Sequence, residues 1–90
     1  MHVLQTATFS KQIKKLHPNQ KKDLDRALTE IITHPLIGAM KKGDLDGIHV
    51  YKFSMVKQLT LIAYQWCEDS NRLILLSLGS HENFYRDLKK

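Results

Sequence analysis

His81 is the residue of this sequence best suited to move protons. It follows Gly79-Ser80 in the chain, and a histidine side chain gains or loses a proton near neutral pH. The sequence places His81 where a strand passes into a helix, a position at which backbone N–H groups can also meet a phosphate. A surface histidine near a helix start would look the same, and the Gly-Ser-His context is what favours an acid–base role.

Three further side chains are candidates for handling phosphate or a nucleotide. Lys52 lies in mid-strand and could hold a phosphate, although lysine is also a common protection of an edge strand. Tyr85 could stack on a base or donate a proton, or it could pack the last helix onto the sheet. Arg86 could bind phosphate, or it could be a solvated charge on a helix.

The charge of the chain favours a polyanionic partner. Lys and Arg number 14 and Asp and Glu number 9, so the net charge is +5, and the pI is near 9.5. In so small a domain this balance favours nucleic acid, an acidic protein or anionic lipid, and the alternative is a soluble protein that happens to be basic. We expect Lys41, Lys42 and Lys57 to contact phosphate, within a wider basic background that includes Lys11, Lys14, Lys15, Lys21 and Lys22.

Metal, cofactor and disulfide chemistry are not indicated. The five histidines show no His-x-x-x-His or carboxylate spacing, and Cys67 is the only cysteine, so no intrachain disulfide can form. Ninety residues predict a single domain, 1–90. The first residues hold no signal-type apolar run, and no stretch approaches the roughly 20 apolar residues that span a bilayer, so we expect a cytoplasmic protein without membrane contact.

The first half of the chain predicts a short strand and two helices. Residues 2–6 favour a strand, and Phe9, Ile13 and Leu16 follow at spacings of four and three, which indicates an amphipathic helix with a basic outer face. A second helix starts near Pro18, which suits a first turn, and its apolar residues recur with helical spacing from Leu24 to Ile32. It ends at His34-Pro35, because a residue before proline disfavours helix. Both His17 and His34 are interpreted as caps.

The second half predicts three strands, at residues 48–55, 59–66 and 72–80, separated by turns at 56–58 and 68–71. Residues 35–47 hold glycines, a proline and lysines and predict a loop. In the first of these strands Tyr51, Phe53 and Met55 share one face, which we expect to pack on the helices. The other face, with Val50, Lys52 and Ser54, is the expected working surface.

These elements predict an α+β fold in the order strand, helix, helix, strand, strand, strand, helix. We expect an antiparallel sheet of about four strands with the helix pair on one face. A short helix at residues 81–90, capped by Ser80, should close the chain.

This order resembles the RelE/ParE superfamily of bacterial toxins. The similarity extends over nearly the whole chain, through the Phe9…Leu16 helix, the Leu45-Asp46-Gly47-Ile48 segment, the Leu61-Ile62-Ala63-Tyr64 strand and the terminal run from Leu78 to Tyr85. The resemblance implies the toxin of a type II toxin–antitoxin pair that cuts messenger RNA, usually in the ribosome, and that an antitoxin with an acidic wrapping segment neutralises.

Site residues follow from the same resemblance. Lys52 matches a functional strand lysine of RelE-type toxins, and Tyr85 falls near a functional aromatic residue. His81 falls where RelE has an arginine and where the YafQ-like branch has its catalytic histidine. The chain departs from RelE at Leu61, where RelE has an active-site arginine, and at Ser54, where it has a second lysine. The YafQ-like branch is also apolar at the first of these positions, so the chain resembles that branch most.

Two other functions stay open on the sequence alone. A ParE-type inhibitor of DNA gyrase has the same fold and no nuclease activity, and fold does not decide function. A non-catalytic RNA-binding module is the second alternative, although the chain has neither an RNP-type aromatic motif nor a Gly-x-x-Gly loop.

Overall fold

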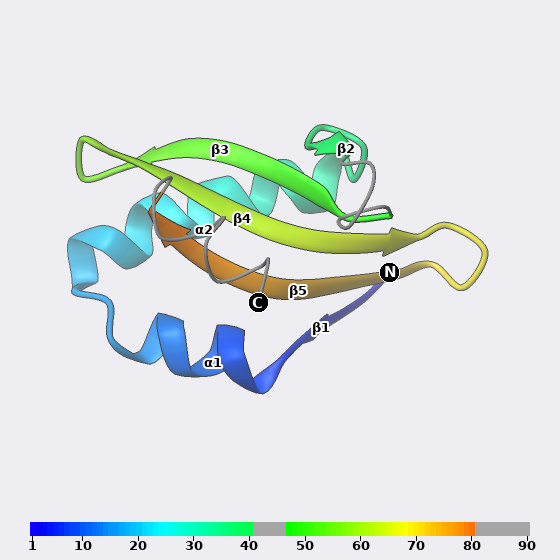
Figure 1. Ribbon diagram of the computed structural model, residues 1–90, viewed down its shortest axis with the longest axis horizontal. Coiled ribbons are helices and arrows are strands. Elements are labelled where there is room, and N and C mark those ends of the chain that lie inside the picture. The colour runs from blue at the N-terminus through cyan, green and yellow to red at the C-terminus, as the bar shows by residue number, and fades with distance from the viewer. Residues whose placement is uncertain (41–46, 81–90) are drawn as a thin grey trace.

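The computed structural model describes residues 1–40 and 47–80 as two helices and a five-stranded sheet (Figure 1). No helix in these two ranges is long and apolar enough to cross a membrane. The elements, in chain order, are β1 (His2–Gln5), α1 (Ala7–Lys14), α2 (Pro18–Thr33), β2 (Ala39–Met40), β3 (His49–Met55), β4 (Gln58–Cys67) and β5 (Arg72–Ser80). The predicted helix at residues 81–90 lies outside the described residues.

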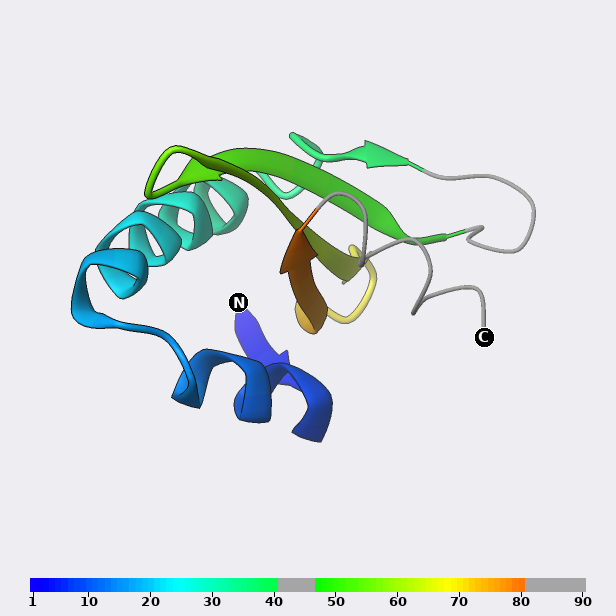
Figure 2. The ribbon, with the colours of Figure 1, turned by 60° about the vertical axis from the view of Figure 1, so that its left-hand side comes forward.

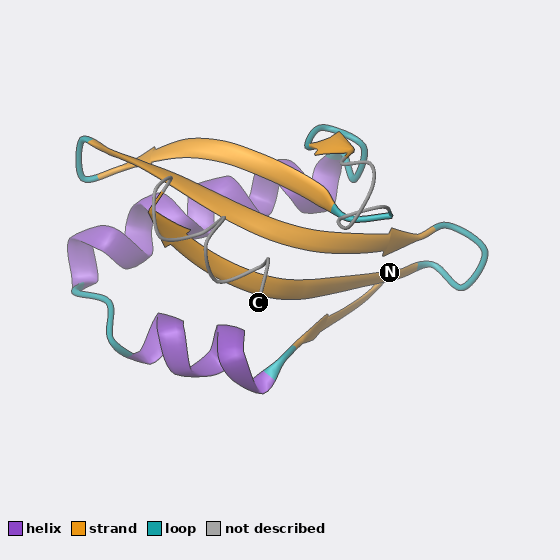
Figure 3. Cartoon of the chain, viewed as in Figure 1, coloured by secondary structure: helices purple, strands orange, loops and turns teal. Residues whose placement is uncertain are grey.

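The sheet has the strand order β1-β5-β4-β3-β2. The predicted antiparallel meander is confirmed in β3, β4 and β5, whose connecting turns lie at opposite ends of β4 (Figure 3). Two details differ from the prediction. The strand β1 runs parallel to β5, so the sheet is mixed, and the two-residue strand β2 forms inside the segment predicted as a loop.

Thr6 connects the parallel strand β1 to both α1 and β5. The backbone N–H of Thr6 donates to the carbonyl of Leu75 at 3.0 Å, and its hydroxyl donates to the carbonyl of Leu76 at 2.8 Å. The same hydroxyl accepts the N–H of Phe9 at 3.1 Å and so caps α1. Thr6 therefore joins β1, α1 and β5, and the cap explains why α1 begins earlier than its apolar spacing predicts.

The second helix forms where the sequence predicts it. Pro18 is its first residue, and the side chain of Gln20 accepts the backbone N–H of His17 at 2.8 Å. His34 takes the C-terminal cap position, and its N–H donates to the carbonyl of Glu30 at 2.9 Å. The expectation that both histidines lie at helix ends is confirmed.

Both helices cover the same face of the sheet, α1 against β5 and α2 against β3 (Figure 2). Fully buried Phe9, Ile31, Ile62, Tyr64 and Leu73 form the centre of this core. Side chains of Tyr51 and Phe53 pack against it, as the alternation in β3 predicts. Burying this face is what holds the helices on the sheet.

A bulge in β5 changes which side chains face the helices. The pairing of β4 with β5 shifts between Ala63 and Tyr64, and Leu76 is the residue left without a partner in the register. As a result Leu75 and Leu78, three positions apart, both enter the helix-side core, and Leu76 packs on the opposite face.

Tyr64 anchors the segment that follows α2. Its hydroxyl donates to the carbonyl of Pro35 at 2.7 Å and accepts the N–H of Gly38 at 2.9 Å. The ring of His49 stacks on the tyrosine ring with centroids 5.3 Å apart, and its Nδ1 lies 3.2 Å from the carbonyl oxygen of Gly38. A Cβ on Gly38 would lie 2.7 Å from the tyrosine hydroxyl, so only glycine fits there. Burial raises the pKa of Tyr64 above its ordinary value.

Candidate functional site

Lys52 lies in the middle of β3 on the face of the sheet turned away from the helices, which we call the outer face. Its neighbours Tyr51 and Phe53 pack into the helix-side core, and strand side chains alternate between faces. The lysine side chain is exposed. Within residues 1–40 and 47–80 it has no ion pair and no side-chain hydrogen bond, so its charge is free to meet an anion.

The register aligns Lys52 with the end of β5 across β4. We call such a row of residues paired across neighbouring strands a rung. Lys52 pairs with Leu61 of β4, and Leu61 pairs with Gly79 of β5. Neighbouring strands lie about 4.8 Å apart, so the Cα atoms of Lys52 and Gly79 are separated by about 10 Å. Gly79 precedes His81 by two residues. The fold thus brings the predicted strand lysine beside the segment that leads to the predicted histidine.

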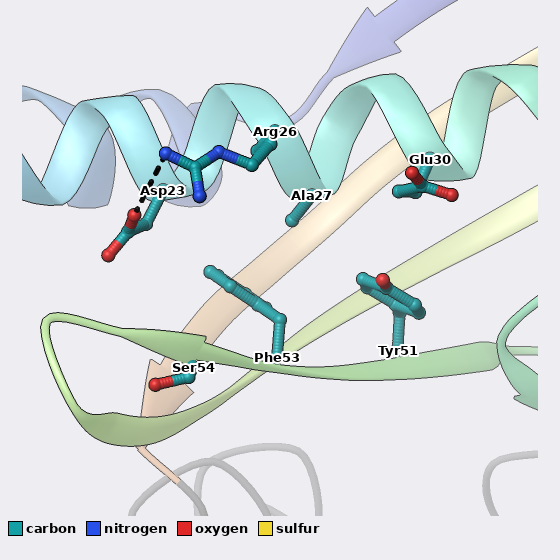
Figure 4. Close-up of a pocket in the computed structure, with 7 residues that line it drawn as sticks. All are labelled: Asp23, Arg26, Ala27, Glu30, Tyr51, Phe53 and Ser54. Atoms are coloured by element: carbon teal, nitrogen blue, oxygen red, sulfur yellow. Dashed lines mark ion pairs between the residues drawn. The ribbon is translucent and has the colours of Figure 1, made fainter.

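The charges of the two faces are segregated. None of the strands β3, β4 and β5 contains an aspartate or a glutamate. On the helix side, by contrast, Asp23, Arg26 and Glu30 of α2 lie over Tyr51 and Phe53 around a small groove of about 130 Å³ (Figure 4). Lys52 therefore projects from a part of the sheet that has no carboxylate to repel a phosphate.

Leu61 is part of a second apolar cluster. It is fully buried with Val50 and Ala63, and Ile48 and Leu76 pack around them. Such a side chain can exclude water but offers no charge or hydrogen bond to a phosphate. The position at which RelE has an arginine is thus a core position here, and charge at the centre of the outer face comes from Lys52.

A groove and a further lysine lie at the same end of the sheet. Thr60 pairs with Ser80, so the β3–β4 turn and the end of β5 are close together (Figure 1). Lys57 is exposed in that turn. A groove of about 190 Å³ opens beside it between the end of α1 and the sheet; its lining includes Lys15, Gln58, Thr60 and Ser80.

Five of the predicted site residues lie outside the described residues. They are His81, Tyr85 and Arg86 near the end of the chain, and Lys41 and Lys42 in the segment after β2. Lys52 and Lys57 are the two that the structure places, and both are exposed. Lys52 lies on the rung with Leu61 and Gly79, whereas Lys57 lies in the β3–β4 turn, beyond the third rung from it.

Two structurally important residues were not singled out from the sequence. Tyr64 was predicted only as a strand residue, although a tyrosine at the end of an apolar run signals a buried hydroxyl that needs partners. Asp23 was not considered, and its carboxylate accepts the backbone N–H of Val56 at 2.8 Å. Its partner is 33 residues away, and no sequence signal pairs the two.

The family of the chain is shown by its sequence. Residues 3–89 match the family described as ParE-like toxin of type II bacterial toxin–antitoxin systems. The match covers almost the whole chain, so this protein belongs to that family of toxins, within the RelE/ParE superfamily. A comparison with curated proteins gives no match.

Solved structures show the same fold. A chain of the intact RelBE toxin–antitoxin complex of E. coli has a TM-score of 0.71 and 19% identity, with 88% of this chain and 94% of the other covered. A chain of the RelBE2 toxin–antitoxin complex of Mycobacterium tuberculosis has a TM-score of 0.72 and 17% identity, with 89% of this chain and 96% of the other covered. A YoeB/ParE toxin from Agrobacterium tumefaciens has a TM-score of 0.70 and 14% identity, with 90% of this chain and 99% of the other covered. At such identities the likeness is one of fold. The YafQ-like placement stays a prediction.

Proposed function

We propose that this type II toxin is a messenger RNA endoribonuclease that acts in the ribosome and stops translation. The supporting observation is the rung of Lys52, Leu61 and Gly79, on strands free of carboxylates, whose Gly79 lies two residues before His81 in the chain. A cation that stabilises charge on phosphorus and a group that exchanges protons near neutral pH both accelerate RNA cleavage without metal.

The proposed reaction uses the 2′-hydroxyl of the substrate as nucleophile. A base accepts the proton of that hydroxyl as its oxygen attacks the neighbouring phosphorus, and an acid protonates the departing 5′-oxygen. His81 is the proposed proton carrier, and Lys52 stabilises the negative charge that builds up on phosphorus. Tyr85 is proposed to stack on a base, and Lys41, Lys42, Lys57 and Arg86 to bind the RNA backbone. The products are a 2′,3′-cyclic phosphate and a free 5′-hydroxyl.

A translation reaction tests this function directly. The purified protein is added to translating ribosomes, and the message is mapped by primer extension. We expect new stops within codons at the ribosomal decoding site, and none on the same RNA without ribosomes. An intact message with unimpaired protein synthesis would refute the proposed function.

A second candidate is inhibition of DNA gyrase. It is favoured by the matched ParE-like family and by the burial of Leu61, which leaves the RelE set of charges incomplete. Pulse-labelling after induction separates the two functions. An early block of DNA synthesis with intact message would favour the gyrase inhibitor, and an early block of protein synthesis favours the nuclease.

The proposed protein partner is an antitoxin with an acidic wrapping segment. Two of the similar structures are toxin–antitoxin complexes. A groove of about 300 Å³ between α1 and α2 has an apolar floor that includes Phe9, Ile13 and Leu24. Its charged lining residues are Lys14, Lys21 and Asp25, so cations outnumber the single carboxylate. An amphipathic segment with acidic residues would match this combination in shape and charge.

A further inference from the structure

The turn between β3 and β4 holds two residues in an unfavourable backbone conformation. Met55 pairs with Gln58, so Val56 and Lys57 form a two-residue turn, and their φ angles are +51° and +66°. Turns of this kind normally contain Asn-Gly, because both central residues must be left-handed. A branched valine there is a genuine outlier, and such strain persists only where surrounding structure imposes it.

Apolar packing does not hold this turn. The side chains of Val56 and Leu59 are 44% and 49% exposed. The contact that does reach the turn comes from α2, where the Asp23 carboxylate oxygen Oδ2 accepts the N–H of Val56 at 2.8 Å. This hydrogen bond is exposed, and its strength comes from the charge of the carboxylate that accepts it.

Arg26 makes only a distant contact with the same carboxylate. Its guanidinium lies 3.9 Å from Oδ1 of Asp23, one turn along the helix (Figure 4). The arginine side chain is 80% exposed, so this ion pair is weak. The hydrogen bond to the turn is therefore the main interaction of Asp23, and it fixes α2 to the tip of the hairpin.

The turn holds Lys57 at the end of the hairpin whose strands carry the proposed substrate surface. Two residues beyond Gln58, Thr60 pairs with Ser80, and the next rung holds Lys52, Leu61 and Gly79. A lysine held in a fixed backbone conformation loses less freedom when it binds a phosphate than a lysine on a loose turn. Strain at a surface turn, imposed by a helix, is typical of a preorganised binding element.

We propose that Asp23 is a positioning residue for RNA binding: its carboxylate holds the β3–β4 turn so that Lys57 meets the RNA backbone. This inference rests on the proposed function. The change in RNA affinity expected on removing Asp23 is therefore opposite in sign to the change that charge repulsion alone would give. A carboxylate near a polyanion repels it, so removing one should tighten RNA binding, whereas removing the positioning carboxylate should weaken it.

The experiment measures binding of the full chain to bacterial ribosomes programmed with a short message, at several salt concentrations. We compare the parent with Asp23→Ala, Lys57→Ala and the double variant, and Asp25→Ala serves as the matched control. Asp25 is an exposed acid two residues along the same helix, so its removal changes the charge equally. All measurements are made well below the melting temperature of each variant.

We expect Asp23→Ala to weaken binding by about 5- to 30-fold. The slope of log affinity against log salt should fall by about one, as for the loss of one phosphate contact. Lys57→Ala should give the same changes, and the double variant should be no weaker than either single one. Asp25→Ala should bind as well as the parent or more tightly.

A rescue variant separates positioning from folding. Asparagine tolerates the left-handed conformation, so Val56→Asn should stabilise the turn without help from α2. Combined with Asp23→Ala it should restore binding. The inference is overturned if Asp23→Ala binds like Asp25→Ala, if its effect adds to that of Lys57→Ala, or if Val56→Asn restores stability without affinity. Failure of the parent itself to bind ribosomes would instead reject the proposed function, and this inference with it.

Discussion

The hydroxyl of Tyr64 accepts a hydrogen bond of 2.9 Å from the backbone N–H of Gly38, 26 residues earlier in the chain. This contact, with the bond from Tyr64 to the carbonyl of Pro35, ties the segment after α2 to the centre of the sheet. The lysines Lys41 and Lys42 follow that segment directly in the sequence. The tyrosine is thus a structural residue of the fold whose hydroxyl, more than its ring, determines where the chain goes after α2.

Tyr64→Phe should destabilise the protein by about 1–3 kcal/mol, because the substitution leaves the buried N–H of Gly38 and the partly buried carbonyl of Pro35 without their partner. Urea unfolding followed by circular dichroism measures the change. Tyr51→Phe is the matched control, since the hydroxyl of Tyr51 has no hydrogen bond within the described residues, and its effect should stay within about 0.5 kcal/mol. Equal losses in the two variants would contradict the role of the Tyr64 hydroxyl.

The raised pKa of Tyr64 predicts a loss of stability in alkali. The folded state favours the neutral phenol, so the contribution is complete below the unfolded pKa of about 10 and is lost as the pH rises through the higher folded pKa. Free energies of unfolding should therefore decline more steeply above about pH 10 in the parent than in Tyr64→Phe. Parallel curves for the two proteins would show that another group causes the alkaline decline.

Replacing Lys52 with Ala should lower the rate of message cleavage by about 10²-fold, because a cation that stabilises the developing charge is lost. The ribosome concentration needed for half-saturation should also rise, since Lys52 holds the phosphate before reaction. Lys52→Arg keeps the charge, so both its cleavage rate and its ribosome concentration for half-saturation should stay closer to those of the parent. Single-turnover cleavage at varied ribosome concentration separates the two effects, and an unaltered rate for Lys52→Ala would remove this lysine from the mechanism.

His81→Ala should reduce single-turnover cleavage by about 10²–10⁴-fold, the usual contribution of general acid–base catalysis. The ribosome concentration needed for half-saturation should change little, which distinguishes this variant from Lys52→Ala. His34→Ala is a control, because that histidine takes the C-terminal cap position of α2 and is not one of the proposed site residues. If His81→Ala cleaves as fast as the parent, the proposed proton carrier is wrong, and Lys52 with Tyr85 would be the next pair to test.

Binding of the antitoxin should weaken as salt is added. The exposed lysines Lys11, Lys14, Lys15, Lys21 and Lys22 surround the two helices, and an acidic segment would be attracted to them over a screening length of about 10 Å at 0.1 M salt. Calorimetry of the complex at low and high salt measures this, and the apolar groove should preserve part of the affinity. An affinity that does not change with salt would contradict the electrostatic contribution.

Much of the fold could be predicted from local patterns. The alternation in β3 correctly placed Tyr51 and Phe53 toward the helices and Lys52 on the other face, and the prolines marked both ends of α2. The bulge at Leu76 could not be predicted, because a run of leucines looks the same in either register. The strand β2 was missed because it depends on Tyr64 and Gly38, a contact between distant parts of the chain.

The same limit applies to the site. Residue type and position in a strand made Lys52 a candidate, but its alignment with Gly79 across Leu61 depends on pairing across two strand interfaces. Asp23 was missed for a related reason, since an aspartate early in a helix ordinarily needs no partner beyond the helix itself. Short-range patterns predict the elements, and the long-range pairings that assemble the site come only from the fold.

The parallel pairing of β1 with β5 also determines when the sheet can be completed during synthesis. His2 pairs with Arg72, so the first strand to leave the ribosomal tunnel must wait for nearly the last one. Contacts so distant in sequence form slowly and late in folding. Lys52 meets Gly79 only after β5 has emerged, so an unfinished chain cannot hold the assembled rung.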